Sequence, residues 1–106
     1  MSPNNQEQYT TDLYKAILKL QDLDEARRFF RDLLTEQEII EFSKRWQTAR
    51  MLDAKKPYSE IEEETGLSSA TVARISKWLN NGCGGYRSLL NKIHQHNPTK
   101  LRKGLS

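Results

Sequence analysis

The side chains best suited to chemistry lie in residues 58–79, YSEIEEETGLSSATVARISKWL, and that chemistry is nucleic-acid recognition. A short helix-forming run ends at Gly66, where glycine adopts a left-handed conformation at little cost. A second run begins after Ser68 or Ser69, either of which can cap a helix. Two helices that cross steeply over a small core form a helix-turn-helix motif. The residues spaced to fill such a core are Ile61, Leu67, Val72 and Ile75.

The second helix of such a motif inserts its N-terminal half into the major groove of DNA. Small outward side chains allow close approach, an alanine methyl can touch a thymine methyl, and an arginine can make two hydrogen bonds to guanine. Hydroxyls and free N–H groups at a helix start bind phosphates. Residues before the first helix could hold the flanking DNA backbone. The expected contacts are Lys56, Tyr58, Ser59, Ser68, Ser69, Ala70, Thr71, Ala73, Arg74 and Lys77, with Lys55 beside them.

The charge distribution favours a polyanionic partner for the C-terminal part of the chain. The net charge is only +3, but all fourteen acidic residues lie at or before Glu64. Residues 1–66 carry ten basic residues and sum to −4, whereas residues 67–106 carry seven basic residues and no acidic one. Such asymmetry indicates a surface that meets a polyanion, and a basic tail without a partner is the alternative. The seven are Arg74, Lys77, Arg87, Lys92, Lys100, Arg102 and Lys103.

Acidic residues in the first helix of the motif keep a second interpretation open. Many such motifs have alanine where this chain has Glu62, because the two helices pack closely there. Carboxylates beside DNA repel phosphates unless they face away or pair with Lys or Arg. A plain helical hairpin, and a helical module that binds a protein partner, therefore remain alternatives to DNA binding. The acidic residues are Glu60, Glu62, Glu63 and Glu64.

The flanking sequence predicts four further helices. Apolar residues at helical spacing indicate a first helix over roughly residues 6–20. The pairs Asp22 with Glu25 and Thr35 with Glu38 are helix start signals for a second and a third helix, the latter ending near Lys55. Pro57 prevents the third helix from continuing. Ser59 with Glu62 forms the capping box that would start the next helix, which ends at Gly66. The sixth helix is expected to begin near Tyr86, after the break at residues 80–85.

The chain of 106 residues predicts one domain at residues 9–94, preceded by a polar extension at 1–8 and followed by a basic tail at 95–106. The composition is that of an all-α protein. A chain this short buries a modest core by itself, so we expect a homodimer, with a monomeric core as the alternative. No secretory signal and no apolar run of ~20 residues is present, which predicts a cytoplasmic protein without membrane contact.

Catalytic, metal and cofactor sites are not expected. Cys83 is the single cysteine, so neither a disulfide within the chain nor a cysteine-based zinc site can form. His94 and His96 are two residues apart, whereas helical metal sites favour a spacing of three or four. The glycines at 82, 84 and 85 follow no strand and lack the Lys-Ser/Thr signature of a phosphate loop. The chain is therefore predicted not to be an enzyme.

Three segments resemble the tryptophan repressor family, specifically its repressor-related branch in Gram-positive bacteria. They are LLTEQEIIEFSKRW at 33–46, YSEIEEETGLSSATVARI at 58–75 and GGYRSLLNKI at 84–93. The resemblance implies six helices in an intertwined homodimer, whose paired reading helices lie about one DNA turn (~34 Å) apart. It also implies a transcription repressor that reads a palindromic operator in double-stranded DNA. Residues implied to lie partly in the dimer core are Phe29, Phe30, Leu33, Ile39, Phe42 and Trp46.

The resemblance also implies an effector pocket, which this chain changes. The threonine and the two arginines of the family pocket correspond to Thr35, Arg45 and Arg74. A glycine that leaves room for the indole ring is replaced by Ile75, and a serine near the amino group of the ligand is replaced by Trp78. Both replacements add bulk, so we expect the two side chains to fill the cavity and L-tryptophan not to bind.

Overall fold

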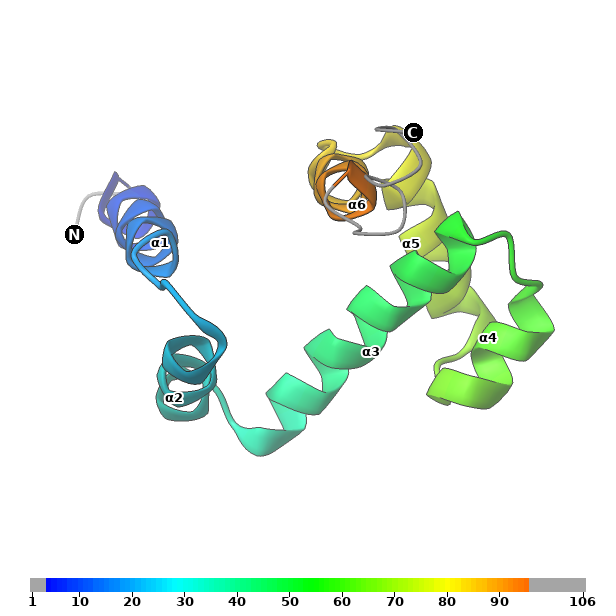
Figure 1. Cartoon of the computed structure of the whole chain (residues 1–106), viewed down its shortest axis with the longest axis horizontal. Coiled ribbons are helices and arrows are strands. Elements are labelled where there is room, and N and C mark those ends of the chain that lie inside the picture. Colours follow the sequence, from blue (N-terminus) through cyan, green and yellow to red (C-terminus); the bar gives the residue numbers. More distant parts are fainter. Residues whose placement is uncertain (1–3, 96–106) are drawn as a thin grey trace, which may run out of the picture. The chain divides into compact units, whose positions relative to one another are not determined.

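All regular elements in residues 4–95, which the computed structural model describes, are α-helices (Figure 1). The expected all-α class with six helices is confirmed within this range. No helix in this range has the length and apolar character that crossing a bilayer requires. The predicted tail residues from 96 onward, with His96 and three basic residues, lie outside the described residues, as do residues 1–3. The helices are α1 (Asn4–Ile17), α2 (Leu23–Leu33), α3 (Glu36–Asp53), α4 (Tyr58–Thr65), α5 (Ser69–Asn81) and α6 (Gly85–Gln95).

The chain divides into two units, residues 1–40 and 41–106. In the first, the expected start signals are confirmed. The Asp22 carboxylate accepts the Glu25 N–H at 2.8 Å at the start of α2. At the start of α3, the Glu38 N–H donates to Thr35 Oγ1 at 3.1 Å and the Thr35 N–H donates to Glu38 Oε1 at 2.9 Å. Each bond satisfies a backbone donor that the helix leaves free.

The predicted bounds of the first helix, roughly 6–20, are wrong at both ends. Helix α1 begins at Asn4, so part of the polar extension expected at residues 1–8 is helical. The helix ends at Ile17: the Leu18 N–H still donates to Tyr14 O at 3.0 Å, but the next two N–H groups bond three residues back, Lys19 N to Ala16 O at 3.0 Å and Leu20 N to Ile17 O at 3.1 Å. This tighter turn is common at helix ends.

Apolar side chains in the first unit are left uncovered within one chain. Helix α2 has no buried residue, although Phe29 and Phe30 pack edge to face with ring centroids 5.4 Å apart. Large apolar side chains that stay exposed in this unit include Leu18, Leu23 and Leu33, with Leu18 exposed by 82%. A helix of this kind gains most of its stability by packing against another surface, which the described residues of the first unit do not provide.

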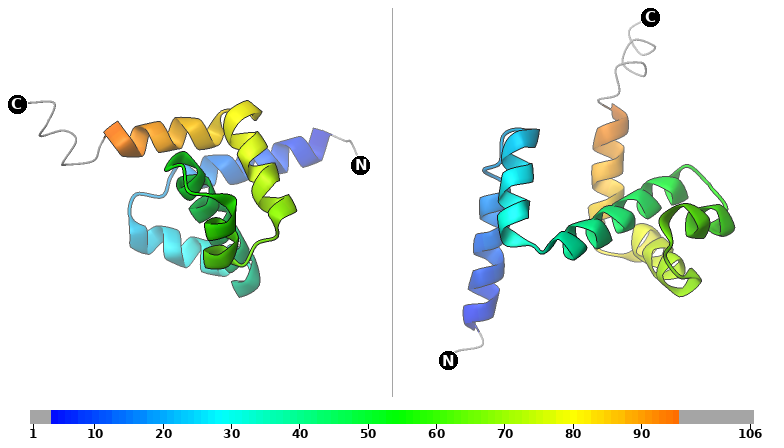
Figure 2. Two further views of the ribbon diagram at one scale, coloured as in Figure 1. Left: turned by 90° about the vertical axis from the view of Figure 1, so that its right-hand side faces the viewer. Right: turned by 90° about the horizontal axis from the view of Figure 1, so that it is seen from below.

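The core of the second unit lies where α3, α4 and α5 meet. Ile61, Val72 and Ile75 are fully buried, and Met51 is nearly so. Met51, Ile61 and Val72 form one cluster, against which Leu52 and Leu67 pack. The core expected between the helices of the motif is therefore confirmed, with α3 as its third wall. Helix α6 contacts α5 and crosses it steeply, with Leu90 buried (Figure 2).

A carboxylate at the end of α3 joins that helix to α6. Asp53 Oδ1 accepts a hydrogen bond from Arg87 Nη1 at 2.6 Å, and Asp53 Oδ2 lies 2.8 Å from His94 Nε2. The hydrogen bonds with His94 and Arg87 lower the pKa of Asp53 below its ordinary value of 3.8. A carboxyl group whose pKa is lower in the folded than in the unfolded protein stabilises the fold above the unfolded pKa. That contribution is lost as the pH falls through the folded pKa.

We expect Asp53→Asn to lower the free energy of unfolding by about 1–2 kcal/mol at neutral pH, because the amide makes weaker bonds to Arg87 than the carboxylate does. The difference from the wild type should shrink as the pH falls below 3.8 and through the folded pKa of Asp53, since the wild-type carboxyl is then protonated. Urea unfolding at about pH 7 and about pH 3, at one fixed protein concentration, measures both values. A difference that stays constant with pH would contradict the assignment.

Candidate nucleic-acid interface

The turn between α4 and α5 has the backbone that the sequence predicts. Gly66 is left-handed, with φ 75° and ψ 5°, and its N–H donates to Glu62 O at 2.8 Å. The buried Thr65 hydroxyl donates to Ile61 O at 2.7 Å and accepts the Leu67 N–H at 3.2 Å. These bonds satisfy backbone groups of the turn beside the buried Thr65. The turn thus fixes the direction in which α5 leaves α4.

The start of α4 differs from the predicted capping box. The helix begins at Tyr58, with Pro57 as its N-cap and no side-chain cap hydrogen bond. Ser59 therefore lies inside the helix, and the prediction that it caps the helix is wrong. Proline fixes φ near the value that a helix start tolerates and has no N–H to satisfy. The first N–H groups of α4 are consequently left without a side-chain acceptor, in a position where helices attract anions.

Helix α5 presents most of the predicted DNA contacts on its surface. Ser68 is the N-cap: its hydroxyl accepts the Thr71 N–H at 3.2 Å and lies 3.0 Å from the Thr71 hydroxyl. Thr71 is half-buried, so less of its side chain is available to contact DNA than in the case of the exposed Ser68. Val72 and Ile75 point into the core, which turns the opposite face of the helix outward. The exposed residues are Ser69, Ala70, Ala73, Arg74 and Lys77.

The charge of the motif differs sharply between its two helices. Helix α5 carries Arg74 and Lys77 and no acidic residue. The four glutamates of α4 make no ion pair with any residue from 4 to 95, although Glu64 accepts a hydrogen bond from Gln47 at 3.4 Å. The exposed face of α5 is thus suited to a polyanion, whereas the glutamate side chains of α4 are not.

Residues just before α4 and at its start line a pocket of about 270 Å³. Other residues, which the sequence did not indicate as DNA contacts, line the same pocket. Lys55, Lys56 and Tyr58, which were expected to hold the flanking DNA backbone, are among its lining residues. Arg87, at the start of α6, also lines it. The sequence shows Arg87 only as one basic residue among seven, because its partner Asp53 is 34 positions away. The other lining residues are Leu52, Ser76, Leu79 and Asn80.

The three residues expected in the effector pocket lie in different units. Thr35 belongs to the first unit, where its hydroxyl is engaged with Glu38 at 3.1 Å in the capping box of α3. Arg45 and Arg74 belong to the second unit. The Arg45 guanidinium lies 5.7 Å from the centre of the Phe42 ring, an arrangement that favours a cation–π contact.

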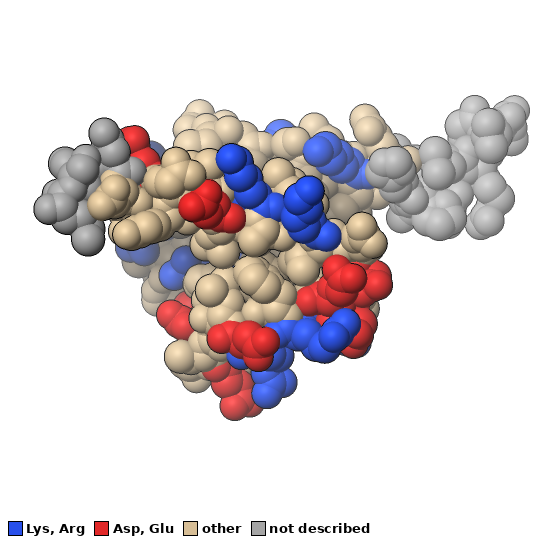
Figure 3. Space-filling view, turned by 90° about the vertical axis from the view of Figure 1, so that its left-hand side faces the viewer, with Lys and Arg blue, Asp and Glu red and all other residues tan. Residues whose placement is uncertain are grey.

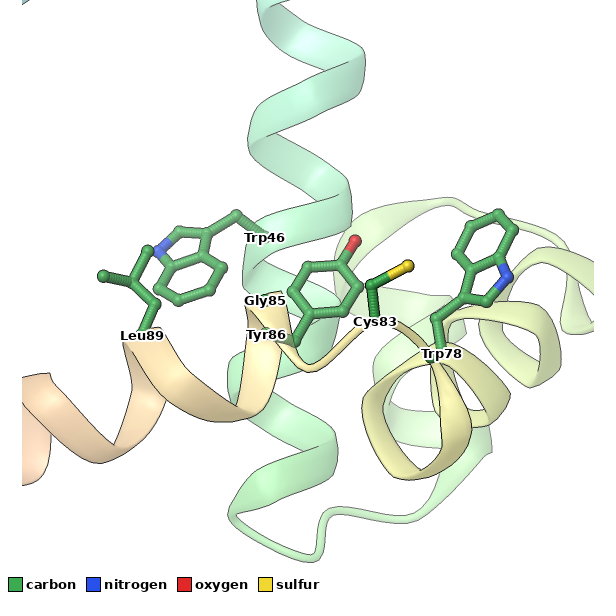
Figure 4. A pocket seen from close by; sticks show the side chains of 7 residues that line it. Trp46, Trp78, Cys83, Gly85, Tyr86 and Leu89 are labelled. Carbon is green, nitrogen blue, oxygen red and sulfur yellow. The ribbon is translucent and has the colours of Figure 1, made fainter. Parts of the chain in front are cut away.

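The two bulky replacements in that pocket have different surroundings. Ile75 is fully buried in the core, whereas Trp78 is 45% exposed. Trp78 lines an open, apolar groove of about 520 Å³ between α3, α5 and α6. In Figure 4 the side chains of Trp46, Tyr86, Cys83 and Trp78 follow one another along it. Trp46 and Tyr86 stack with ring centroids 6.3 Å apart.

Comparisons with known proteins agree with this geometry. The family model described as Trp repressor protein matches residues 8–94. The uncharacterized protein YerC of Bacillus subtilis is 42% identical over 83 residues, which are 78% of this chain and 80% of YerC. A TrpR-like protein of Eubacterium eligens has a crystal structure with a TM-score of 0.77 and 42% identity, covering 81% of this chain and 89% of that one. The crystal structure of a candidate Trp repressor from Staphylococcus aureus has a TM-score of 0.76 and 36% sequence identity. The match covers 81% of this chain and 86% of that one.

Proposed function

Because the chain belongs to the Trp repressor protein family, we propose that it is a transcription repressor that reads a palindromic operator in double-stranded DNA with α5. The family consists of DNA-binding regulators rather than enzymes, and this chain is of that kind. The observation that supports the finer proposal is the outward face of α5. It combines small side chains with Arg74 and Lys77, carries no acidic residue and follows a turn whose backbone is hydrogen-bonded.

Each part of that face has a chemical role in the proposed complex. The exposed Ala70 and Ala73 let the helix axis approach the base edges, and their methyl groups can contact thymine. Arg74 provides the two parallel donors that guanine O6 and N7 accept. Ser69 and the free N–H groups at the start of α5 suit a phosphate, because the helix dipole is positive there. Lys77, one turn beyond Ala73, extends the positive charge along the helix.

We further propose that the repressor acts as a homodimer. Apolar side chains of α2 and of α6, including Leu23, Leu89 and Ile93, stay exposed in one chain. A second copy would cover such surfaces, which soluble monomers rarely leave bare over large areas. Acidic and basic side chains are interspersed among uncharged ones in Figure 3. A two-fold dimer would present two copies of α5 to one duplex.

The effector and the location follow from the same proposal. L-Tryptophan is not the expected effector, because Ile75 occupies the place of the glycine that makes room for the indole ring, and its side chain is fully buried in the core. Trp78 adds further bulk where the family has a serine. Since the proposed partner is DNA, we place the protein in the cytoplasm.

One observation favours a second candidate function, a helical module that binds a protein partner. The four glutamates of α4 form an acidic surface beside the proposed reading helix. Such a surface would suit a basic protein segment, and it would weaken contact with phosphates. The two functions differ in their response to salt, because DNA binding releases the cations condensed on the phosphates.

We expect the affinity for a mixed-sequence duplex to fall steeply with salt, with a slope of log K against log salt near −0.9 for each phosphate contacted. Fluorescence anisotropy of a labelled duplex, titrated with the full chain at several salt concentrations, measures this slope. Removing Lys77 as Lys77→Gln should make the slope shallower by about 0.9 if that side chain contacts one phosphate. Absence of any duplex binding at low salt would favour the protein-interaction module.

A further inference from the structure

We propose that the pocket lined by Lys55, Lys56 and Arg87 binds a phosphodiester of the DNA backbone, beside the stretch that α5 reads. The pocket lies between the α3–α4 connection, the start of α4, α5 and the start of α6. This inference rests on the proposed function and adds an anchoring site to it. The same three cations could bind free phosphate, and the experiment below separates the two sources.

The lining of the pocket is cationic and polar. Three of its eight lining residues are basic and none is acidic. Tyr58, Ser76 and Asn80 add polar side chains, and the Asn80 amide is held by a bond to Ser76 O at 2.9 Å. The pocket also adjoins the uncapped start of α4, where free N–H groups favour an anion. Such surroundings fit the negatively charged oxygens of a phosphate better than any neutral group.

The backbone of Lys55 is strained in a way that a glycine would relieve. Its φ is 65°, the left-handed region, and it is the one residue other than glycine with positive φ among residues 4–95. The Lys55 N–H donates to Leu52 O and the Lys56 N–H donates to Met51 O, both at 3.0 Å. These are the two bonds of the Schellman motif, whose left-handed position is most often glycine. A lysine there puts a positive charge at the pocket despite the strain.

Arg87 is held in place by a partner outside the pocket. Its Nη1 bonds to Asp53 Oδ1 at 2.6 Å, while the other Asp53 oxygen is engaged with His94. A guanidinium has five N–H donors, so this bond leaves donors for an anion. The side chain is 42% exposed, and it lines the pocket from the side of α6. The Asp53 carboxylate, in contrast, does not line this pocket.

The test uses Lys55→Gly, because this change removes the charge and also relieves the strain. We expect the melting temperature to rise by about 4 °C, because glycine adopts the left-handed conformation at the end of α3 without strain. The affinity for a mixed-sequence duplex should fall by about 3- to 10-fold, and the salt slope should become shallower by about 0.9. A loss of affinity in a more stable protein cannot come from unfolding. Lys55→Asn, which also tolerates the left-handed region, should show the same loss.

The control is Lys15→Gln, which removes a charge from the exposed surface of α1 outside the pocket. It should leave affinity and slope near those of the wild type. If Lys55→Gly binds the duplex with the same affinity and the same salt slope as the wild type, the inference is wrong. The proposed function would still stand in that case, because the wild type binds the duplex. If inorganic phosphate at constant ionic strength stabilises the wild type but not Lys55→Gly, and DNA affinity is the same in both, the site binds free phosphate and the DNA assignment is wrong. Failure of the wild type to bind any duplex would instead contradict the proposed function itself.

Discussion

Replacing Ile61 with alanine should lower the free energy of unfolding by about 2–5 kcal/mol, the range for removing a buried aliphatic side chain and leaving a cavity. Ile61 is fully buried, with an exposed fraction of 0%, and it packs with Met51 and Val72. These contacts join α4 to both α3 and α5. The cavity would open in the centre of the motif, where the surrounding helices cannot all move inward.

Thermal and urea unfolding at one fixed protein concentration would measure the loss, and the melting temperature should fall by at least about 8 °C. DNA binding should weaken as well, because the core fixes the direction of α5. The matched control is Glu63→Ala on the same helix, which removes an exposed side chain and should change stability by no more than about 0.5 kcal/mol. Equal effects of Ile61→Ala and Glu63→Ala would contradict the assigned core.

Replacing Arg74 with alanine should weaken operator binding by about 1–3 kcal/mol, roughly 5- to 150-fold in the dissociation constant. Arg74 is exposed on the outward face of α5, so the change should leave folding intact. The loss should be concentrated at one base pair of each half-site, because a bidentate contact discriminates guanine from the other bases. Competition between the operator and single-base variants of it measures this loss of discrimination.

Arg74→Lys separates base reading from simple charge. Lysine keeps the positive charge but lacks the planar pair of donors. We expect Arg74→Lys to keep most of the binding to mixed-sequence DNA and to lose most of the discrimination at that base pair. If Arg74→Ala weakens binding equally at all sequences, Arg74 contacts a phosphate instead. If neither variant changes affinity, α5 is not the reading helix.

Local signals explain why much of the fold could be predicted from sequence. The capping residues Asp22, Thr35 and Ser68 act on N–H groups three residues away, and Gly66 acts at its own position. The spacing of Ile61, Val72 and Ile75 places them on facing sides of two helices. Short-range geometry determines all of these features, so the residue types and their spacing are sufficient to predict them.

Features that depend on the path of the whole chain could not be predicted in this way. One local signal also misled: Ser59 matched a capping box, but the helix begins at Tyr58 with Pro57 as its N-cap. Asp53 meets Arg87 and His94 across 34 and 41 positions of sequence. The left-handed Lys55 gives no sequence signal, since glycine or asparagine is the usual sign of that conformation. The pocket beside α4 therefore became visible only in three dimensions.

Selection of bound sites from random double-stranded DNA at physiological salt tests most directly whether two copies of α5 read one duplex. We expect the bound pool to converge on a single inverted repeat whose half-sites are centred about 10 base pairs apart. The same selection with Arg74→Ala should lose preference at one position of each half-site. A pool that stays random, or that converges on a sequence without two-fold symmetry, would contradict this expectation.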